Sequence, residues 1–466
     1  MTKLITRFAP SPTGPLHLGG LRTALINYIL SKQDKSSKFY IRIEDTDKKR
    51  SEKKFTDEII NGLKWIGLNW DSEIQIQSKR ISRHQEIANI LLSQKNAYKC
   101  ICTENTLKEK RERIKLNKVN KKKLCTTCKN DDKIQLSDNN YVVRIHIPDN
   151  GSTKIKDNIK GDISINNLEM DDFILIRQNG EPTYMLSVVV DDFDLGVNSI
   201  VRGDDHFYNT FRQYYIYKYM NWPLPEYSHI PLIHGEDGAK LSKRHGAVNL
   251  LELKNKGYLP EAIINNLILL GWSPNKGNYE FVNLQEIIKK FKITDISKSS
   301  SIFSYEKLNF FNNYYLRKNE KLDYFLSYCK ENDNLIKYYN EDKEKLIKIF
   351  NLYKKQLNYY EEIIKIIPIY FDKNFKFLKI EEFNKIFNNK IQDFKNDLDE
   401  IKVWDKKNLS EFIDNYLVKN NIKFPEFGKP LRNILINSLS GPSLSDILDI
   451  LGKKDTIERL NQYIVD

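Results

Sequence analysis

The 466-residue sequence lacks long hydrophobic runs, and this absence limits where the protein can work. No apolar stretch approaches the ~18 residues of a membrane-spanning helix, so we expect no membrane partner. The chain enters an apolar strand almost at once, which leaves no room for a signal or transit peptide. We therefore expect a cytoplasmic protein. No internal repeat or long low-complexity linker is evident, which argues against a repeat architecture.

Cysteine is scarce, with five in the chain, and four of these form two close pairs. In a cytoplasmic protein such pairs favour metal binding over disulfides. Four thiolates suit tetrahedral Zn²⁺ and leave no open position for catalysis, so we predict one structural zinc site. Its ligands would be Cys100, Cys102, Cys125 and Cys128. The alternative is a decayed site with reduced, metal-free cysteines, and the lone Cys329 is expected to be a small buried apolar residue.

Positive charge is in modest excess. Lys and Arg number 75 against 62 Asp and Glu, which gives a net charge of +13. A chain long enough for several domains and carrying this charge suits a polyanionic partner. The sequence is also rich in Lys, Asn and Ile throughout, and a coding bias is an alternative source of the excess. We therefore give the charge little weight.

The first thirty residues read as a strand, a turn and a helix. Residues 4–8 form a short apolar run, prolines and glycine at 10–15 break the backbone, and residues 21–29 are apolar at helical spacing. His17, Gly19 and Gly20 should therefore lie at a helix N-terminus, where free N–H groups and the helix dipole favour an anion. We predict a phosphate cradle of the nucleotide-binding kind. The alternative is an ordinary strand-to-helix turn with a satisfied histidine.

The next strand, residues 39–43, ends in acidic groups that begin with Glu44. In open α/β sheets ligands bind outside the carboxyl ends of the strands, so Glu44 is well placed to hold an ammonium group. The alternative is a solvated acidic turn that caps the following helix. We expect that helix over residues 56–66, with Thr56 as its cap, and another over residues 83–92.

A second acidic group follows residues 184–190, which we interpret as a buried strand reached through a hairpin from residues 173–177. Asp191, Asp192 and Asp194 end this strand. A tight acidic trio suggests Mg²⁺ in isolation, but we prefer turn and cap roles.

Two lysine-rich segments offer charge to an anion. Residues 108–123, between the cysteine pairs, read equally well as a solvated helix face and as a phosphate-binding face. Lys240 and Lys243 follow a glycine-flanked turn and are poor core material. On a flexible loop they can swing onto a polyphosphate and neutralise its charge.

Four segments together resemble a known family. RFAPSPTGPLHLGGLRTAL, RIEDTD, VVVDDFDLGVNSIVRGDDH and KLSKRHGAV, in this order, are similar to the glutamyl-tRNA synthetases of bacterial type, within the class I aminoacyl-tRNA synthetases. Glutaminyl relatives usually carry a Glu-Pro-Asn run where this chain has Ser11-Pro12-Thr13. Many family members have a Cys-x-His second half at the zinc site, whereas this chain has Cys-x-x-Cys, which keeps four ligands.

The resemblance implies an α/β fold, with a Rossmann-like parallel-sheet catalytic domain, an α+β insertion and an all-α C-terminal region. The expected domains are the catalytic halves 1–80 and 200–250, an acceptor-end-binding insertion 81–199, a stem-contact helical domain 251–317 and an anticodon-binding region 318–466. The last region is poor in glycine and rich in Lys, Ile, Phe and Tyr, as a helical bundle would be. Most of its aromatic residues at helical spacing should belong to the core.

The resemblance also implies the reaction. ATP with Mg²⁺ and L-glutamate give glutamyl-adenylate and pyrophosphate, and the glutamyl group moves to the terminal adenosine of tRNA(Glu). The implied catalytic residues are His17, Lys240 and Lys243. The implied ATP contacts are Gly19, Gly20, Asp205, Ser242, Lys243 and Arg244. The implied glutamate contacts are Arg7, Ala9, Ser11, Glu44, Tyr184 and Arg202.

Three rival interpretations share parts of this pattern. A truncated paralogue that glutamylates a modified tRNA base would lack the roughly 150 residues after Arg317. A non-catalytic tRNA-binding homologue would be expected to lose His17 or the loop lysines, and a glutaminyl enzyme is disfavoured by the Ser11 segment. Whether tRNA(Gln) is also charged stays open, and a monomer is the family expectation.

Overall fold

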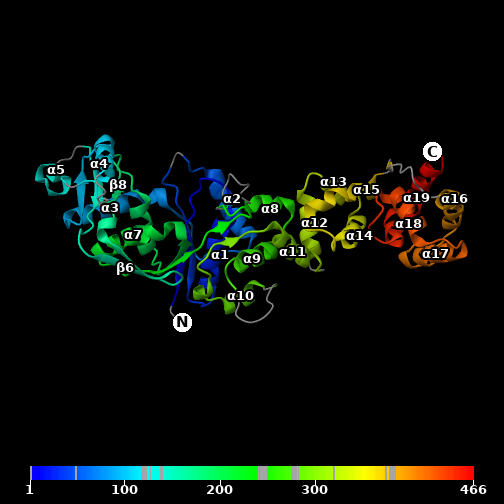
Figure 1. Cartoon of the computed structure of the whole chain (residues 1–466). Helices are drawn as coiled ribbons and strands as arrows, with labels where there is room; N and C mark the ends of the chain where they lie inside the picture. Colours follow the sequence, from blue (N-terminus) through cyan, green and yellow to red (C-terminus); the bar gives the residue numbers. More distant parts are fainter. Residues whose placement is uncertain are drawn as a thin grey trace. The chain divides into compact units, whose positions relative to one another are not determined.

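The computed structural model describes residues 3–47, 50–116, 123–125, 127–136, 140–239, 241, 249–273, 281, 283–318, 321–372, 375–376 and 385–465 (Figure 1). The chain divides into two compact units. Unit 1 comprises Met1–Lys254 and Pro260–Leu308, and unit 2 comprises Asn255–Leu259 and Asn309–Asp466. Each helix in the described ranges is too short or too polar to cross a bilayer.

Unit 1 begins with parallel strands around a central helix. β1 (Ile5–Phe8) pairs with β2 (Lys38–Ile43), and β2 pairs with β3 (Gln75–Ile76), all in parallel. α1 (Leu18–Lys32) joins β1 to β2 and has buried residues all round its circumference. The predicted strand, turn and helix are therefore confirmed. α2 (Lys53–Trp65) follows, and Thr56 lies inside it instead of capping it, so that prediction was wrong.

A second sheet in unit 1 has the order β7-β6-β10-β9. β10 (Glu226–Ile230) runs parallel to β9 (Ser199–Gly203) and β6 (Ser152–Asp157), and β7 (Gly161–Asn166) pairs antiparallel with β6. The first sheet continues into the second, because the Asn198 amide donates to the Ile5 carbonyl at 3.2 Å beside β1 and β9. The two halves of a Rossmann-like parallel sheet thus meet, as predicted.

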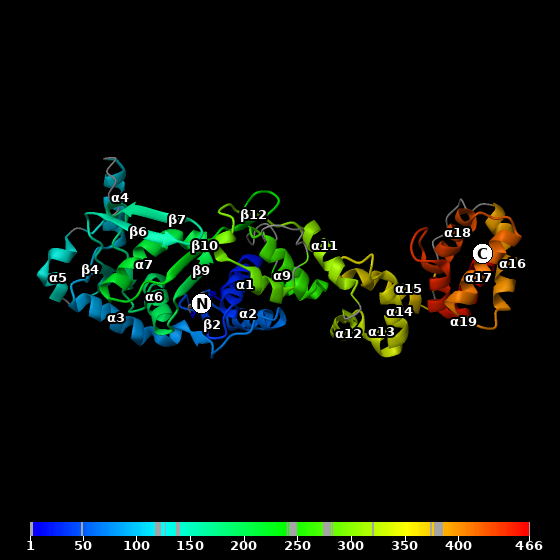
Figure 2. The same cartoon turned by 90° about the horizontal axis from the view of Figure 1, so that it is seen from below.

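The residues between the two halves form an α+β insertion. Its antiparallel sheet contains β4 (Ala97–Cys100), β5 (Val142–Ile145) and β8 (Ile174–Ile176). Around it, and in the chain that follows, are α3 (Ile81–Ser93), α4 (Glu104–Leu116), α5 (Asp132–Leu136), α6 (Tyr184–Asp194) and α7 (Phe207–Tyr219) (Figure 2).

The strand predicted over residues 184–190 is instead the helix α6. Its valines favour a strand locally, but tertiary context routinely overrides propensity. Here Val188, Val189 and Val190 are all buried in one core with residues of α3, β8 and α7. The Thr183 carbonyl accepts hydrogen bonds from the Leu186 and Ser187 amides, which starts the helix.

The chain beyond residue 230 is mainly helical. In unit 1 the short strands β11 (Ile233–His234) and β12 (Ser301–Ile302) pair in parallel. The helices that follow β11 in sequence are α8 (Leu250–Lys256), α9 (Pro260–Leu269), α10 (Leu284–Lys290) and α11 (Tyr305–Leu316). Those of unit 2 are α12 (Leu322–Glu331), α13 (Ile336–Glu341), α14 (Lys343–Tyr353), α15 (Ile367–Phe371), α16 (Lys385–Asp399), α17 (Lys406–Lys419), α18 (Phe424–Ile436) and α19 (Leu444–Val465).

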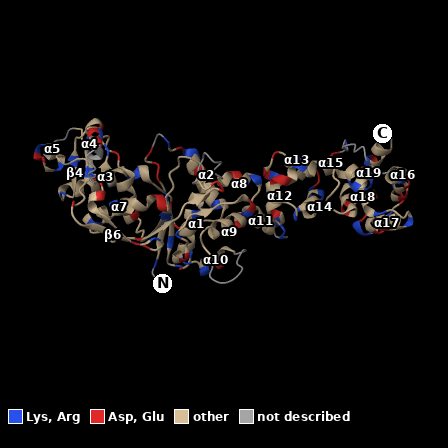
Figure 3. Ribbon diagram, in the orientation of Figure 1, with Lys and Arg blue, Asp and Glu red and all other residues tan. Residues whose placement is uncertain are grey.

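The described part of unit 2 is helical throughout, which confirms the predicted all-α C-terminal region. Its core is aromatic: Phe325 stacks on Phe350, and Phe387, Phe394 and Phe427 form another cluster, all fully buried. Lys and Arg are interspersed with Asp and Glu along both units (Figure 3). The net positive charge is therefore spread over the chain.

Candidate active site and metal centre

A cavity of about 560 Å³ opens at the carboxyl ends of β1, β2 and β9. In open α/β sheets this is where ligands bind. Predicted site residues from segments far apart in sequence line it: Arg7, Ala9, Ser11, His17, Gly19, Gly20, Glu44, Tyr184, Arg202 and Asp205. The remaining predicted residues Lys240, Ser242, Lys243 and Arg244 lie outside the described part of the chain.

His17 is the N-cap of α1, and its Nδ1 accepts a hydrogen bond from the Gly20 amide at 3.0 Å. Because Nδ1 is the acceptor, a neutral ring carries its proton on Nε2, which becomes a donor. A Cβ on Gly19 would lie 3.2 Å from His17 Nδ1, and one on Gly20 would lie 3.2 Å from Leu16 Cδ1. Gly19 therefore leaves room for the His17 ring, and Gly20 leaves room for the Leu16 side chain.

Leu241 and Asn249, the described residues on either side of positions 242–248, lie next to this cavity. Leu241 lines the cavity, and its amide donates to the Ile233 carbonyl at 3.0 Å. Asn249 forms an antiparallel bridge with His17, and the Leu250 amide donates to the Leu16 carbonyl at 3.0 Å. Both described ends of the segment therefore lie beside the histidine cradle.

Arg202, at the end of β9, lines the cavity, and one of its guanidinium nitrogens has no partner among the described residues. Its Nε donates to His229 Nε2 at 3.1 Å, and its Nη2 donates to Thr210 Oγ1 at 2.7 Å. The side chain is only 5% exposed, and its Nη1 has no hydrogen-bond partner among the described residues. A buried donor without a partner is costly, so this nitrogen is suited to an anionic ligand.

Arg7 and Glu44 are tied to each other through a buried ion-pair network. Arg7 Nε and Arg42 Nη1 both donate to Asp192 Oδ1, at 3.0 and 2.5 Å, and Arg42 Nη2 donates to Glu44 Oε1 at 2.9 Å. Burial raises the pKa of Glu44 and outweighs the effect of Arg42. Burial opposes ionisation of Asp192 too, but Arg42 and Arg7 lower its pKa on balance.

The acidic trio therefore has another role than the turn and cap roles predicted for it. Asp191 and Asp192 lie on α6 and are fully buried, and Asp191 accepts from Arg80 Nε at 2.7 Å and from Gln77 at 2.9 Å. Asp194 pairs with Arg83 at 3.1 Å. These carboxylates neutralise arginines from the first part of the chain, which leaves no reason to assign Mg²⁺ to them.

Sequence reasoning missed the partners of the predicted residues. Arg42 could have been found from the sequence. It lies on β2, two residues before Glu44, so the two side chains are expected on the same side of the chain. No comparable local signal marks Asp157, Thr210 or His229, since they are brought to Arg202 by strand pairing and by a helix.

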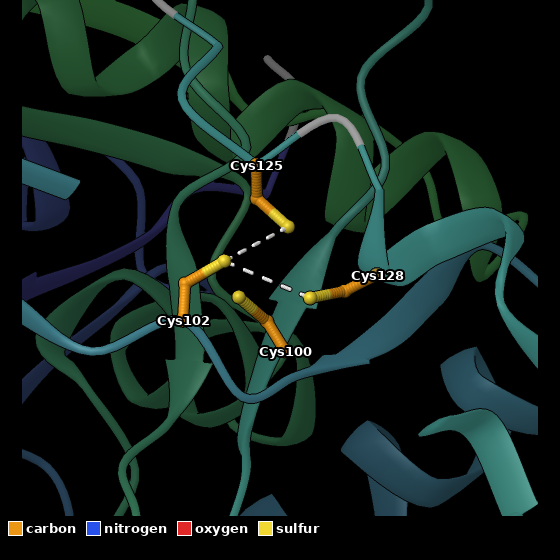
Figure 4. A group of neighbouring side chains, drawn as sticks. All are labelled: Cys100, Cys102, Cys125 and Cys128. Carbon is orange, nitrogen blue, oxygen red and sulfur yellow. Dashed lines mark hydrogen bonds between the residues drawn. The ribbon is translucent and has the colours of Figure 1, made fainter. Parts of the chain in front are cut away.

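The four paired cysteines meet at one point of the insertion. Their Sγ atoms all lie within 4.8 Å of one another, and Cys102 Sγ lies 3.7 Å from both Cys125 Sγ and Cys128 Sγ (Figure 4). Sulfurs about 2.3 Å from a tetrahedral Zn²⁺ are separated by about 3.8 Å. The group could therefore hold a metal ion. Cys329 is fully buried and apart from this group, as expected.

Comparisons with known proteins agree with this geometry. A family model described as "tRNA synthetases class I (E and Q), catalytic domain" matches residues 3–310, and one described as "Anticodon binding domain" matches residues 320–464. The chain belongs to this class I tRNA synthetase family. A synthetase of this class uses ATP and Mg²⁺.

Full-length synthetases of the family resemble the chain from end to end. "Glutamate–tRNA ligase" of Lawsonia intracellularis is 37% identical, with 99% of each chain covered. "Glutamate–tRNA ligase" of Buchnera aphidicola is 37% identical over 99% of this chain and 98% of its own. The crystal structure of a glutamate tRNA ligase from Elizabethkingia meningosepticum, in complex with its amino acid, matches with a TM-score of 0.85 at 28% identity, covering 100% and 99% of the two chains.

Proposed function

We propose that the protein is a glutamate–tRNA ligase. It activates L-glutamate with ATP to glutamyl-adenylate and pyrophosphate, and then transfers the glutamyl group to the 3′-terminal adenosine of tRNA(Glu). Its relatives carry this name over their full lengths. The observation that carries the assignment on this chain is that Arg202 lines a cavity together with Arg7 and Glu44, and that its buried Nη1 has no hydrogen-bond partner among the described residues.

These three side chains match the three charges of the amino acid. Arg202 and Arg7 offer guanidinium groups to two carboxylates, and the ionised Glu44 offers a partner to the ammonium group. Tyr184 and Ser11 complete the wall of the pocket. Glutamine would leave a buried guanidinium without a charged partner, which penalises the amide relative to the acid.

ATP would bind in the same cavity, beside the amino acid. The Gly20 amide is engaged by His17, so the glycine contributes close approach more than a donated hydrogen bond. The His17 ring offers its Nε2 proton to a phosphate oxygen, and the free amides of the first turn of α1 favour the same charge. Lys240 and Lys243 would reach the phosphates from the other side, with Ser242, Arg244 and Asp205 completing the ATP site. In-line attack by a carboxylate needs little more than positioning and charge neutralisation.

The cysteine group fits one structural Zn²⁺. Its four thiolates would complete a tetrahedral shell and leave no position for substrate. The metal would hold the residues after β4 against the short 3-10 helix Cys128–Asn130. The side-chain amide of Gln135 already donates to the carbonyls of Lys99 and Cys128 there, at 3.0 and 2.7 Å. Its role is therefore to stabilise the insertion.

We also propose a division of the chain into functional domains. The boundaries 1–80 with 200–250, 81–199, 251–317 and 318–466 divide the chain by function, with the insertion on the acceptor end and the last region on the anticodon. A cytoplasmic monomer remains the expected form. Among the rival interpretations, the match over residues 320–464 to an anticodon-binding model disfavours the truncated paralogue.

The test is aminoacylation of purified tRNA with labelled amino acids. Transcripts of tRNA(Glu) and tRNA(Gln) are charged separately with glutamate and with glutamine. Charging of tRNA(Glu) with glutamate alone supports the proposal, and charging of tRNA(Gln) as well would assign a non-discriminating enzyme. Absence of charging with every pair would support the non-catalytic homologue.

A matched pair of variants tests the pocket. Arg202→Gln should raise the KM for glutamate roughly tenfold or more, because a hydrogen bond to a charged group is lost. Arg212→Gln, on α7, removes an arginine that pairs with Asp171 at 2.6 Å on the surface, and it should leave this KM unchanged. Equal values for the two variants would remove Arg202 from the pocket.

A further inference from the structure

Arg202 is held from behind by a buried histidine and a buried aspartate. Arg202 and His229 are direct neighbours in the parallel pairing of β9 with β10. His229 Nε2 lies 3.1 Å from Arg202 Nε, and His229 Nδ1 lies 2.6 Å from Asp157 Oδ2, on the next strand. His229 is 0% exposed and Asp157 is 3% exposed. The three side chains thus form a chain of hydrogen bonds across three adjacent strands.

The direction of each proton in this chain is determined. Arg202 Nε–H can only donate, so His229 Nε2 must accept. The His229 proton therefore lies on Nδ1 and is donated to Asp157. Burial lowers the pKa of His229, which keeps the ring neutral and its Nε2 lone pair available.

Asp157 is itself fixed by the backbone. Its Oδ1 accepts from the amides of Ile159 and Lys160 at 2.9 and 2.8 Å. Its Oδ2 accepts from the His229 amide at 3.1 Å as well as from the ring. The carboxylate therefore cannot rotate without losing several hydrogen bonds.

We propose that Asp157 and His229 are positioning residues, which set the tautomer of the histidine and thereby aim Arg202 Nη1 at the bound amino acid. This inference rests on the proposed role of Arg202 in glutamate binding. The guanidinium is planar, so anchoring Nε on His229 and Nη2 on Thr210 fixes the direction of Nη1. A carboxylate that arrives in the cavity meets a preorganised donor and does not have to order it.

Asp157→Asn tests the tautomer. With its oxygen kept on the amides of Ile159 and Lys160, the asparagine turns its NH₂ group toward His229 Nδ1. The ring then carries its proton on Nε2, where it faces the Arg202 Nε–H, and two donors oppose each other. Arg202 must move, and we expect the KM for glutamate to rise roughly tenfold or more. The KM for ATP should change less than twofold, in pyrophosphate exchange with tRNA(Glu) present.

His229→Gln removes the ring whose tautomer Asp157 sets. Together with Asp157→Asn it completes a double-mutant cycle. A glutamine can offer its oxygen to Arg202 whatever residue stands at 157. In this background Asp157→Asn should therefore change the KM for glutamate less than twofold, and the two substitutions should be strongly non-additive. An equal effect of Asp157→Asn in both backgrounds would overturn the mechanism.

A third comparison covers the case in which Asp157→Asn does not fold. His229→Gln keeps an acceptor for Arg202, whereas His229→Phe keeps the ring shape without one. The inference requires a KM for glutamate at least fivefold lower in the glutamine variant than in the phenylalanine variant. Equal values would overturn it.

Two controls separate this inference from its premise. Tyr227→Phe, on the same strand, deletes a buried hydroxyl that has no partner among the described residues, and it should leave both KM values unchanged. Arg202→Gln reports on the premise. If it leaves the KM for glutamate unchanged, the proposed pocket fails. If it raises that KM while Asp157→Asn does not, the pocket holds and the positioning role fails.

Discussion

Asp192→Asn should destabilise unit 1 through charge alone. Both Arg7 and Arg42 donate to the Oδ1 atom of Asp192, and an asparagine keeps that oxygen in place. The ion pairs around it join Arg7 and Arg42 to Glu44, Asp191 and Asp192, and Arg80 links Asp191 to Asp194 nearer the surface. The substitution removes the charged carboxylate that pairs with Arg7.

The size of the effect follows from burial. Asp192 is 1% exposed and Arg42 is 0% exposed, so water cannot take over the lost charge. Removing one partner of a buried ion pair costs about 3–5 kcal/mol, and the retained geometry favours the lower end. Since 1 kcal/mol shifts the unfolding midpoint of a large domain by about 2 °C, we expect a decrease of about 6 °C.

Tryptophan fluorescence during thermal unfolding measures this shift. Four of the five tryptophans lie in unit 1, and Trp222 stacks on Phe193, the neighbour of Asp192, at 3.9 Å. A Trp404→Phe background removes the signal of unit 2. The matched control is Asp194→Asn on the same helix, whose 21% exposed carboxylate pairs with arginines near the surface.

The control should shift the midpoint by no more than about 2 °C, because exposed ion pairs contribute about 0–1 kcal/mol. Equal small shifts for both variants would show that the network does not depend on the Asp192 charge. The reasoning about the buried site would then be refuted.

Three other changes have defined outcomes. Lys243→Ala should slow pyrophosphate exchange in the presence of tRNA at least tenfold, while tRNA binding measured by filter retention stays nearly unchanged, because the lysine neutralises charge only as pyrophosphate leaves. Replacing Cys125 and Cys128 by Ser should release zinc, seen by elemental analysis, and expose the insertion to proteolysis. Burial raises the pKa of Glu44, so the KM for glutamate should rise on acidification while the pH is still above about 4.3, where the substrate side chain titrates.

The first two changes have control variants, and the pH dependence has an outcome that would contradict it. Lys256→Ala removes an exposed lysine and should leave exchange at the wild-type rate. Cys329→Ser should leave the zinc content unchanged, because this buried thiol lies apart from the metal group. A KM for glutamate that stays constant down to acid unfolding would remove Glu44 as the partner of the amine.

The sequence was most informative where function depends on short local segments. The histidine at the start of α1 could be placed from the prolines before it and the helical spacing after it. The cysteine pairs could be joined because two close pairs are typical of a metal site with four thiolate ligands. Glu44 could be placed because a strand ends there.

The sequence was least informative where side chains meet through tertiary structure. The helix α6 was predicted as a strand, since valines favour strands and nothing local reveals the core that surrounds them. Asp192 was therefore assigned to a turn, although its partners lie 150 and 185 residues earlier. Likewise, His229 looks like any strand residue until β10 is laid beside β9.

The distance along the chain between Arg42 and Asp192 also orders events during synthesis. The two residues are 150 positions apart, and most of the insertion lies between them. At roughly 5–20 residues per second, a nascent Arg42 is made on the order of 10 s before its counterion. The arginines at the pocket side of the first half-sheet therefore stay solvated and without this counterion until the insertion has been made. A chain arrested before α6 would therefore lack the carboxylate to which both Arg7 and Arg42 donate.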